Sequence, residues 1–347
     1  MPGYPPGPVA GPSDLDLGPS DLDLGPSDPE SGASDLDLRQ SGPGSGQSGP
    51  ESGPVLGGPR PGGGPSAHAT ARARNADFWA GAAAGWIRHA DRQDALGRPL
   101  GAIALDRLAP RPGERILDVG CGCGGTTAEL AAAVGPTGAA VGLDLSVDMV
   151  RAAAERFPGP RFLAADIETV PEVAGAPFDA AYSRMALMSL ADPVAGCAAV
   201  RRALRPGGRL AATVFRDGGA NPWLAAALLG AAPHVGALPP LPVGDEPGPF
   251  AFADAGRARR VLVAAGFAEV GVEAHDVELR APDQPETVAA WLVEVGPAGA
   301  AYRAASPGRQ AAARAGAAGL LSRYRDRGVG YRLPAGLWLL TARAPDH

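Results

Sequence analysis

Residues 116–124 read Ile-Leu-Asp-Val-Gly-Cys-Gly-Cys-Gly, and this stretch decides the expected fold. Its apolar start predicts a buried strand over 115–119, and a helical pattern over 125–134 begins directly after the glycines. Glycine suits the sharp turn between them because it adopts backbone conformations that other residues avoid. A strand that turns through glycines into a helix is the first unit of a doubly wound α/β sheet.

Strand and helix patterns alternate after this unit, which predicts a mostly parallel, seven-stranded sheet with helices on both faces. The parallel strands are expected at 115–119, 139–143, 161–164, 178–182 and 209–215, and the helices between them at about 125–134, 147–156 and 193–204. A helix at 254–265, an alternating run over 267–279, helical stretches at 286–295 and 308–326, and a strand at 337–343 complete the chain. We expect the last two strands to pair antiparallel at one sheet edge.

Two further segments flank this sheet in a single domain over 67–347. Helices at 75–90 and 94–108 are expected to form an N-terminal cover, with order beginning near Thr70. A Gly/Pro-rich insertion over 217–250 is expected to form a lid.

The glycines alone leave the ligand undecided. Gly120, Gly122 and Gly125 also fit the GxGxxG pattern of dinucleotide-binding proteins, and a single match of that kind is weak. Asp118, two residues before the first glycine, would repel a pyrophosphate but would suit a cationic ammonium group.

Two more aspartates follow the next two strands. Asp144 ends the second strand, where it can accept hydrogen bonds from both hydroxyls of a ribose. Asp166 ends the third strand, where it can accept from an adenine amino group while Ile167 packs on the ring. Each acid could instead cap a helix or begin a turn. Their joint order and spacing at the switch point of the sheet favour a nucleoside site.

These motifs resemble those of class I S-adenosylmethionine-dependent methyltransferases, in particular the quinone-biosynthesis and natural-product branch. The matching pieces are ILDVGCGCG (116–124), VGLDLS (141–146), AADIE (164–168), FDAAYSRMALM (178–188) and LRPGGRL (204–210), within a resemblance that covers about 75–280. The resemblance implies the Rossmann-like methyltransferase fold and S-adenosylmethionine as cofactor. It is specific for the cofactor and says little about the methyl acceptor.

The resemblance also assigns roles to matching positions. The implied cofactor contacts are Asp118, Gly120, Gly122 and Gly124 at the methionine and ribose, Asp144 at the ribose, Leu145, Met149, Asp166 and Ile167 at the adenine, and Ser183 or Arg184 near the transferred methyl. Ordinary roles compete with some of these: Met149 fits a helix core position, and Ser183 with Arg184 fits the surface end of a strand.

The acceptor side is expected to be apolar. Trp79 and Trp86 of the cover helices, Trp223 and Phe250 of the insertion, and Arg184 are the candidate lid and acceptor residues, although both cover tryptophans also suit core packing. His234 is the candidate catalytic base, ahead of His89 and His275, and a surface or structural histidine is the competing interpretation.

The first 66 residues differ in composition from the rest. They hold nine acidic residues and two arginines, and the heptapeptide GPSDLDL occurs at 11–17 and again at 18–24. A Gly-Pro every seven residues prevents a helix, so we expect a disordered tail. A second interpretation is that the DLDL segments add as strands to the sheet of a protein partner.

Composition excludes several other classes. Without the acidic tail the chain is close to neutral, so a nucleic-acid partner is not expected. There is no lysine, which excludes lysine Schiff-base chemistry. The cysteines Cys121, Cys123 and Cys197 lack CxxC spacing, so neither a disulfide framework nor a bound metal is expected. No membrane span or signal peptide is apparent, and a cytoplasmic protein is expected.

Three hypotheses follow. The leading one is an enzyme that transfers a methyl group from S-adenosylmethionine to an O, C or N atom of a hydrophobic small molecule by in-line displacement. The second keeps the fold but uses the cofactor for other chemistry, or binds NAD through GxGxxG. The third is a non-catalytic scaffold that recruits partners through its tail. The three aspartates argue against the third, since a scaffold would not need them.

Overall fold

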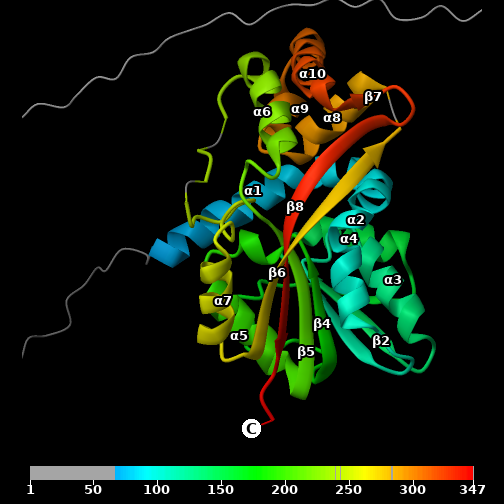
Figure 1. Cartoon of the computed structure of the whole chain (residues 1–347), viewed down its shortest axis with the longest axis vertical. Coiled ribbons are helices and arrows are strands. Elements are labelled where there is room, and N and C mark those ends of the chain that lie inside the picture. The colour runs from blue at the N-terminus through cyan, green and yellow to red at the C-terminus, as the bar shows by residue number, and fades with distance from the viewer. Residues whose placement is uncertain (1–66, 239, 243, 283, 347) are drawn as a thin grey trace, which may run out of the picture. The chain divides into compact units, whose positions relative to one another are not determined.

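The sheet is built around β1 (Arg115–Val119), and its strand order is β3-β2-β1-β4-β5-β8-β6. Figure 1 labels β2, β4, β5, β8 and β6 of this sheet. The structure is a computed structural model that describes residues 67–238, 240–242, 244–282 and 284–346. All of them belong to one unit, Pro61–His347. The strand order reverses direction at β1, so the switch point, where such sheets bind ligands, lies between the carboxyl ends of β1 and β4.

Five strands run parallel and the others antiparallel. The parallel strands are β1, β2 (Ala139–Asp144), β3 (Arg161–Ala164), β4 (Phe178–Arg184) and β5 (Leu204–Phe215). The antiparallel strands are β6 (Ala268–Ala281), the two-residue β7 (Arg325–Asp326) and β8 (Gly330–Arg343). The predicted doubly wound sheet and its antiparallel edge are confirmed, with β7 as an unpredicted short addition to the seven main strands.

Helices cover both faces of the sheet, as the alternating pattern predicts. One face packs on α2 (Ala90–Leu108) and α3 (Gly125–Val134), through Ile116 of β1 and Tyr182 of β4. The other packs on α5 (Pro193–Ala203) and α7 (Ala255–Ala264) in the main core, which includes Leu117 and Val200. The short helix η1 (Leu187–Ser189) follows β4, and α4 (Val147–Arg156) packs beside β2 and β3.

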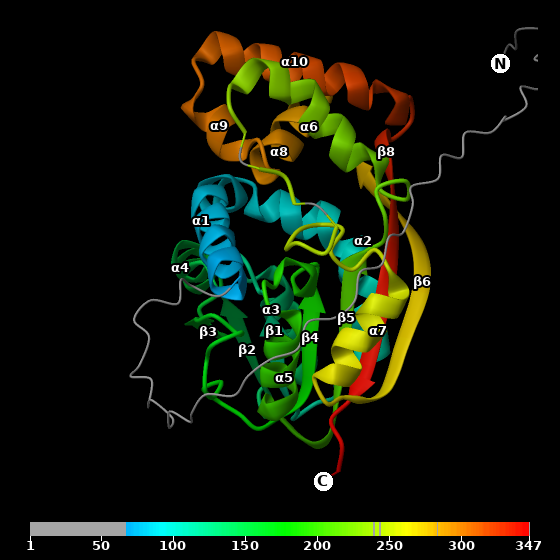
Figure 2. The same ribbon diagram turned by 90° about the vertical axis from the view of Figure 1, so that its left-hand side faces the viewer.

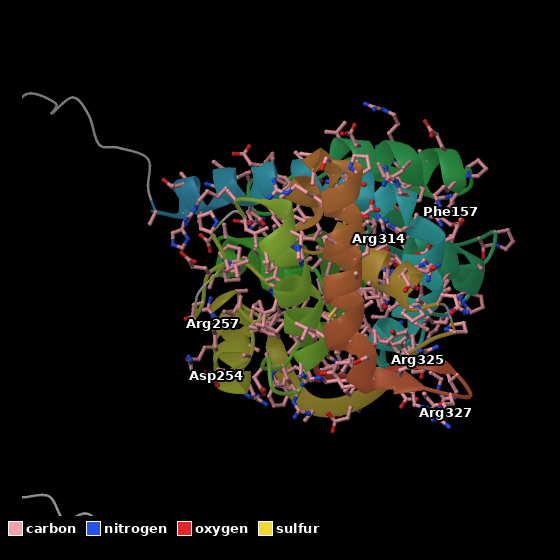
Figure 3. All side chains as sticks on the ribbon, turned by 90° about the horizontal axis from the view of Figure 1, so that it is seen from above. Phe157, Asp254, Arg257, Arg314, Arg325 and Arg327 are labelled. Carbon is pink, nitrogen blue, oxygen red and sulfur yellow. The ribbon has the colours of Figure 1, made fainter. Side chains whose placement is uncertain are left out.

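A helical cap stands beyond the carboxyl ends of the strands. It consists of α6 (Pro222–Val235), α8 (Pro285–Val295), α9 (Gly299–Ala304), α10 (Pro307–Leu321) and the short η2 (Ser322–Tyr324). Figure 2 shows β6 and β8 running from the sheet into this cap, and α1 (Ala67–Arg88) lying between the cap and the sheet. Seen from above, α6 and α10 lie side by side, with Arg314 on α10 (Figure 3). Among the described helices, none has both the length and the apolarity needed to cross a membrane.

Several elements differ from the predictions. The insertion over 217–250 holds the 14-residue α6, which an Ala/Leu-rich run after Pro222 favours despite the surrounding glycines and prolines. The single helix expected at 308–326 is wrong, because α10 ends at Leu321 and the chain turns into β7. The helix α1 begins at Ala67, before the expected start, and β8 begins at Gly330 rather than at 337. The predicted tail, residues 1–66, lies outside the described residues.

Candidate functional site

The glycine loop after β1 turns through three residues with positive φ. Gly120, Gly122 and Gly124 have φ values of 74°, 53° and 89°. A methyl group on Gly120 would collide with Ala186, and one on Gly124 would lie 2.9 Å from the Ala153 side chain. At Gly122 such a methyl would meet nothing within 4 Å. Gly120 and Gly124 therefore serve close packing, whereas Gly122 is the open part of the loop, where a ligand can approach the backbone.

Asp144 at the end of β2 holds this loop in shape. Its Oδ2 accepts a 2.8 Å hydrogen bond from the Gly122 N–H, and its Oδ1 accepts one of 2.8 Å from the Ser146 N–H. Burial raises the pKa of Asp144, although these backbone hydrogen bonds favour the charged form. Each oxygen keeps a second lone pair, so the carboxylate can still accept hydrogen bonds from ligand hydroxyls.

Asp118 on β1 is fully buried, and only one of its two oxygens is satisfied. Its Oδ2 accepts a 2.7 Å hydrogen bond from the Thr127 hydroxyl of α3, whereas Oδ1 has no partner among the described residues. Burial raises the pKa of Asp118 to about 6, against the opposing effects of the Thr127 and Thr126 hydroxyls and of the Arg184 charge. A buried carboxylate oxygen without a hydrogen bond is costly. An ammonium group could donate a hydrogen bond to Oδ1, so this carboxylate fits the methionine end of S-adenosylmethionine.

The two residues expected at the adenine have different surroundings. Asp166 is half-buried after β3, and its Oδ1 accepts a 2.9 Å hydrogen bond from the Glu168 N–H. Ile167 is buried within the main core. Asp166 is therefore placed at the carboxyl edge of the sheet as expected, while the position of Ile167 is that of a core residue.

Ser183 and Arg184 are the last two residues of β4, and their side chains make different contacts. The Ser183 hydroxyl is buried and donates a 2.9 Å hydrogen bond to the Val119 carbonyl, so it links β1 and β4 inside the sheet. Arg184 runs beneath α2, where added methyl groups at Gly97 and Gly101 would lie within 3.9 Å and 2.9 Å of its side chain. Arg184 therefore packs against α2, on the same face of the sheet as Asp118.

The two tryptophans of α1 lie over the glycine loop. Trp79 and Trp86 pack edge to face with ring centroids 5.6 Å apart, next to a buried cluster that contains Cys123 of the loop and Met149 of α4. The Trp86 indole also donates a 3.0 Å hydrogen bond to the Val295 carbonyl at the end of α8. These residues, expected at the acceptor, therefore pack beside Met149, which was expected at the adenine together with the half-buried Leu145.

The residues expected in the insertion lie elsewhere. Trp223 is buried, donates a 2.8 Å hydrogen bond to the Pro334 carbonyl and packs edge to face on Phe215, which is a core position. Phe250 packs partly buried against the main core. His234 lies near the end of α6, where its ring would be 3.3 Å from a methyl group on Gly316 of α10. That place is a contact between two cap helices.

His89 and His275, the other two candidate bases, each lie close to a glutamate. His89 sits at the break between α1 and α2, with Nε2 3.6 Å from a carboxylate oxygen of the buried Glu294. Burial lowers the pKa of His89, and the nearby Glu294 opposes this effect. His275 lies on the edge strand β6, 3.8 Å from Glu273.

Sequence reasoning missed a set of charged residues that fastens α2 to the loop. Arg156, the last residue of α4, donates 2.6 Å hydrogen bonds to the Cys123 carbonyl and to Asp91. It also donates a 2.7 Å hydrogen bond to Asp94. No local signal could have revealed them, because they are ordinary surface residue types and Arg156 and Asp94 are 62 residues apart.

Comparison with known proteins gives concordant findings. The methyltransferase-domain family matches residues 116–208. The nocamycin O-methyltransferase of Saccharothrix syringae is 35% identical over 213 residues, which are 57% of this chain and 76% of that protein. The demethylmenaquinone methyltransferase of Beutenbergia cavernae is 38% identical over 120 residues, 34% of this chain and 47% of that protein. An uncharacterized 37.1 kDa protein in transposon TN4556 of Streptomyces fradiae is 43% identical over 112 residues, 31% of this chain and 32% of that protein. The chain thus spans three quarters of the first relative and half or less of the other two.

Proposed function

The chain belongs to the class I S-adenosylmethionine-dependent methyltransferases, and from this premise we propose that it methylates an O, C or N atom of a hydrophobic small molecule. The fully buried Asp118, with one unpartnered carboxylate oxygen, carries the proposal. Such a carboxylate favours a cationic ligand group and disfavours the pyrophosphate of a dinucleotide. When bound, S-adenosylmethionine supplies an electrophilic methyl group on a sulfonium, which departs as a neutral thioether.

Four positions would hold this cofactor. Asp118 would take the ammonium, and the open backbone at Gly122 would lie against the methionine and ribose parts. Asp144 would accept hydrogen bonds from the ribose hydroxyls, and Asp166 from the adenine amino group. Because Asp144 already binds the Gly122 N–H, the loop is held in the shape the ligand needs.

The chain contributes mainly orientation and exclusion of water. Methyl transfer is an in-line displacement, so a rigid site that aligns the acceptor lowers the barrier. Positive charge is lost at the sulfonium as the reaction proceeds, so apolar surroundings such as Trp79 and Trp86 suit it. A base is needed only for a weakly acidic acceptor. The place of His234 between α6 and α10 gives it no support as that base.

The elements above the site support an apolar acceptor. Leu96 and Leu100 of α2 are partly buried against the main core, which also holds Trp291 of α8. The Trp291 indole donates a 2.8 Å hydrogen bond to Gln93, which joins α8 to α2 by a neutral contact. Sites for small molecules are mostly apolar with few polar groups. Two relatives are named for small molecules, nocamycin and demethylmenaquinone, which agrees with this class.

Calorimetry with three ligands tests the cofactor. We expect S-adenosylmethionine and its demethylated product S-adenosylhomocysteine to bind, and NAD not to bind. Methyl transfer is then measured with S-adenosylmethionine labelled in its methyl group, against phenols, quinols and aliphatic acids of matched size. Tight binding of NAD, or label transfer only to charged acceptors, would reject the proposal.

A further inference from the structure

The guanidinium of Arg184 has few polar partners among the described residues around it. The Arg184 side chain is 19% exposed, and its carbon chain packs under Gly101 of α2. The nearest carboxylate oxygen is Asp94 Oδ1, 3.6 Å from Nη2, which is too long for a hydrogen bond. Within the described part of the chain, the Arg184 guanidinium forms this ion pair and donates no hydrogen bond. Several N–H donors of a largely enclosed arginine are therefore available to a ligand.

The Asp94 carboxylate lies at the N-terminus of α3. It lies against Gly125, the first residue of α3, so closely that a methyl group on Gly125 would overlap it. The N-terminus of a helix favours negative charge because its first N–H groups are free and its dipole is positive there. Arg156 holds Asp94 in this place through the 2.7 Å hydrogen bond described above.

Asp118 carries the opposite charge on the neighbouring strand. It lies on β1, next to the strand that carries Arg184, and its Oδ1 is buried without a partner in the described residues. Arg184 lies two residues beyond Tyr182, which pairs with Asp118, so the two side chains lie on the same face of the sheet, and the Arg184 charge lowers the pKa of Asp118. One unsatisfied anion and one poorly satisfied cation thus lie on the same face of the sheet, on neighbouring strands. This pair matches the ammonium and carboxylate of an amino-acid zwitterion.

We propose that Arg184 and the N-terminus of α3 bind the carboxylate of the cofactor's amino-acid end, and that Asp94 competes with this carboxylate for Arg184. The inference rests on the proposed function, since it assumes that S-adenosylmethionine is the ligand. The exchange replaces one carboxylate by another, so Arg184 keeps an anionic neighbour throughout. Arg156 still binds Asp91 and the Cys123 carbonyl after the exchange, which keeps α2 attached to the loop.

Competition between Asp94 and the ligand carboxylate predicts the direction in which the affinity changes when Asp94 is neutralised. If Asp94 competes, the neutral Asp94→Asn should bind S-adenosylhomocysteine more tightly, by about fivefold for a partly exposed ion pair. If Asp94 only positions Arg184, the same substitution should weaken binding. Asp91→Asn is the matched control, because Asp91 also binds Arg156 but, within the described structure, forms no ion pair with Arg184.

The experiment compares two ligands on each variant by calorimetry. S-adenosylhomocysteine carries the amino-acid end, and 5′-methylthioadenosine lacks it. We expect Asp94→Asn to tighten only the first, Asp91→Asn to change neither, and Arg184→Gln to weaken only the first by roughly 10- to 100-fold. The ratio of the two affinities within one variant is insensitive to a general loss of structure, and Arg184→Lys should restore part of it.

Two results would overturn the inference while leaving the proposed function intact: an unchanged ratio in Arg184→Gln, or weaker S-adenosylhomocysteine binding by Asp94→Asn. Failure of the wild-type chain to bind either ligand would reject the proposed function and the inference with it.

Discussion

The backbone N–H of Gly122 donates a 2.8 Å hydrogen bond to Asp144 Oδ2, which joins the open point of the glycine loop to the end of the neighbouring strand. Gly122 has φ of 53°, and a methyl group on it would meet no protein atom within 4 Å. We therefore expect Gly122→Ala to fold with a loss of about 1–2 kcal/mol from the left-handed backbone. Its affinity for S-adenosylhomocysteine should fall by more than about tenfold, because the methyl enters the ligand's space.

Gly113→Ala is the control for backbone strain. Gly113 also has positive φ, 86°, and its nearest atom to an added methyl is Thr137 Oγ1 at 3.6 Å, in a turn before β1. It should lose comparable stability in denaturant unfolding and keep full affinity in calorimetry. Equal affinity losses in both variants would contradict the placement of the ligand at Gly122.

The raised pKa of Asp118, about 6, predicts proton release when the cofactor binds. An ammonium next to Asp118 lowers this pKa, so near pH 6 binding should release up to about half a proton per site. Affinity should accordingly fall as the pH drops through 6, because the protonated acid does not attract a cation. Calorimetry in buffers of different ionisation enthalpy measures the released protons.

Asp118→Asn should bind with no proton release at this pH, since an amide has no proton to lose. The same release in the variant would assign it to another group, and Asp144, whose pKa burial also raises, is then the candidate. The pH dependence of folding has the opposite sign. The stability that protonated Asp118 contributes is fully present below the ordinary aspartate pKa and is lost as the pH rises through about 6.

The tryptophans of α1 should report cofactor binding. Trp79 and Trp86 pack next to Cys123 of the loop and Met149, whereas Trp223 is buried in the main core. We expect S-adenosylhomocysteine to change the tryptophan fluorescence, Trp79→Phe to remove about half or more of that change, and Trp223→Phe to leave it intact. A signal that survives in Trp79→Phe and disappears in Trp223→Phe would show that α1 does not cover the cofactor.

The sheet and the glycine loop were predictable because their signals are local. Apolar runs of strand length, the glycines after β1 and the N-cap Ser146 each act within a few residues. Asp118 and Asp144 could be proposed for the same reason, since the residue at a parallel strand's carboxyl end has a fixed place in a doubly wound sheet.

The rest depends on contacts between distant segments. Arg156 and Asp94 meet only after α4 and α2 have packed, and neither residue differs from an ordinary surface charge in the sequence. The helix α6 was missed because the prolines and glycines of the insertion outweighed the Ala/Leu run within it. The sequence suggests His234 as a catalytic base, but its place between α6 and α10 depends on a helix pairing that no periodicity indicates.

The crossing of α6 and α10 provides a stability prediction for the cap. Gly316 of α10 and Gly230 of α6 approach so closely that a methyl group on Gly316 would overlap the Gly230 carbonyl. Gly316→Ala should therefore lower the free energy of unfolding by about 1–3 kcal/mol, as overpacking of a close contact does. Gly319→Ala on the same helix adds a methyl that meets nothing within 4 Å, so it should raise stability by roughly 0.5–1 kcal/mol through helix propensity. Denaturant unfolding measures both, and S-adenosylhomocysteine affinity should stay unchanged because neither glycine contacts the loop. If Gly316→Ala were as stable as Gly319→Ala, the two helices could not be as closely packed as the structure has them.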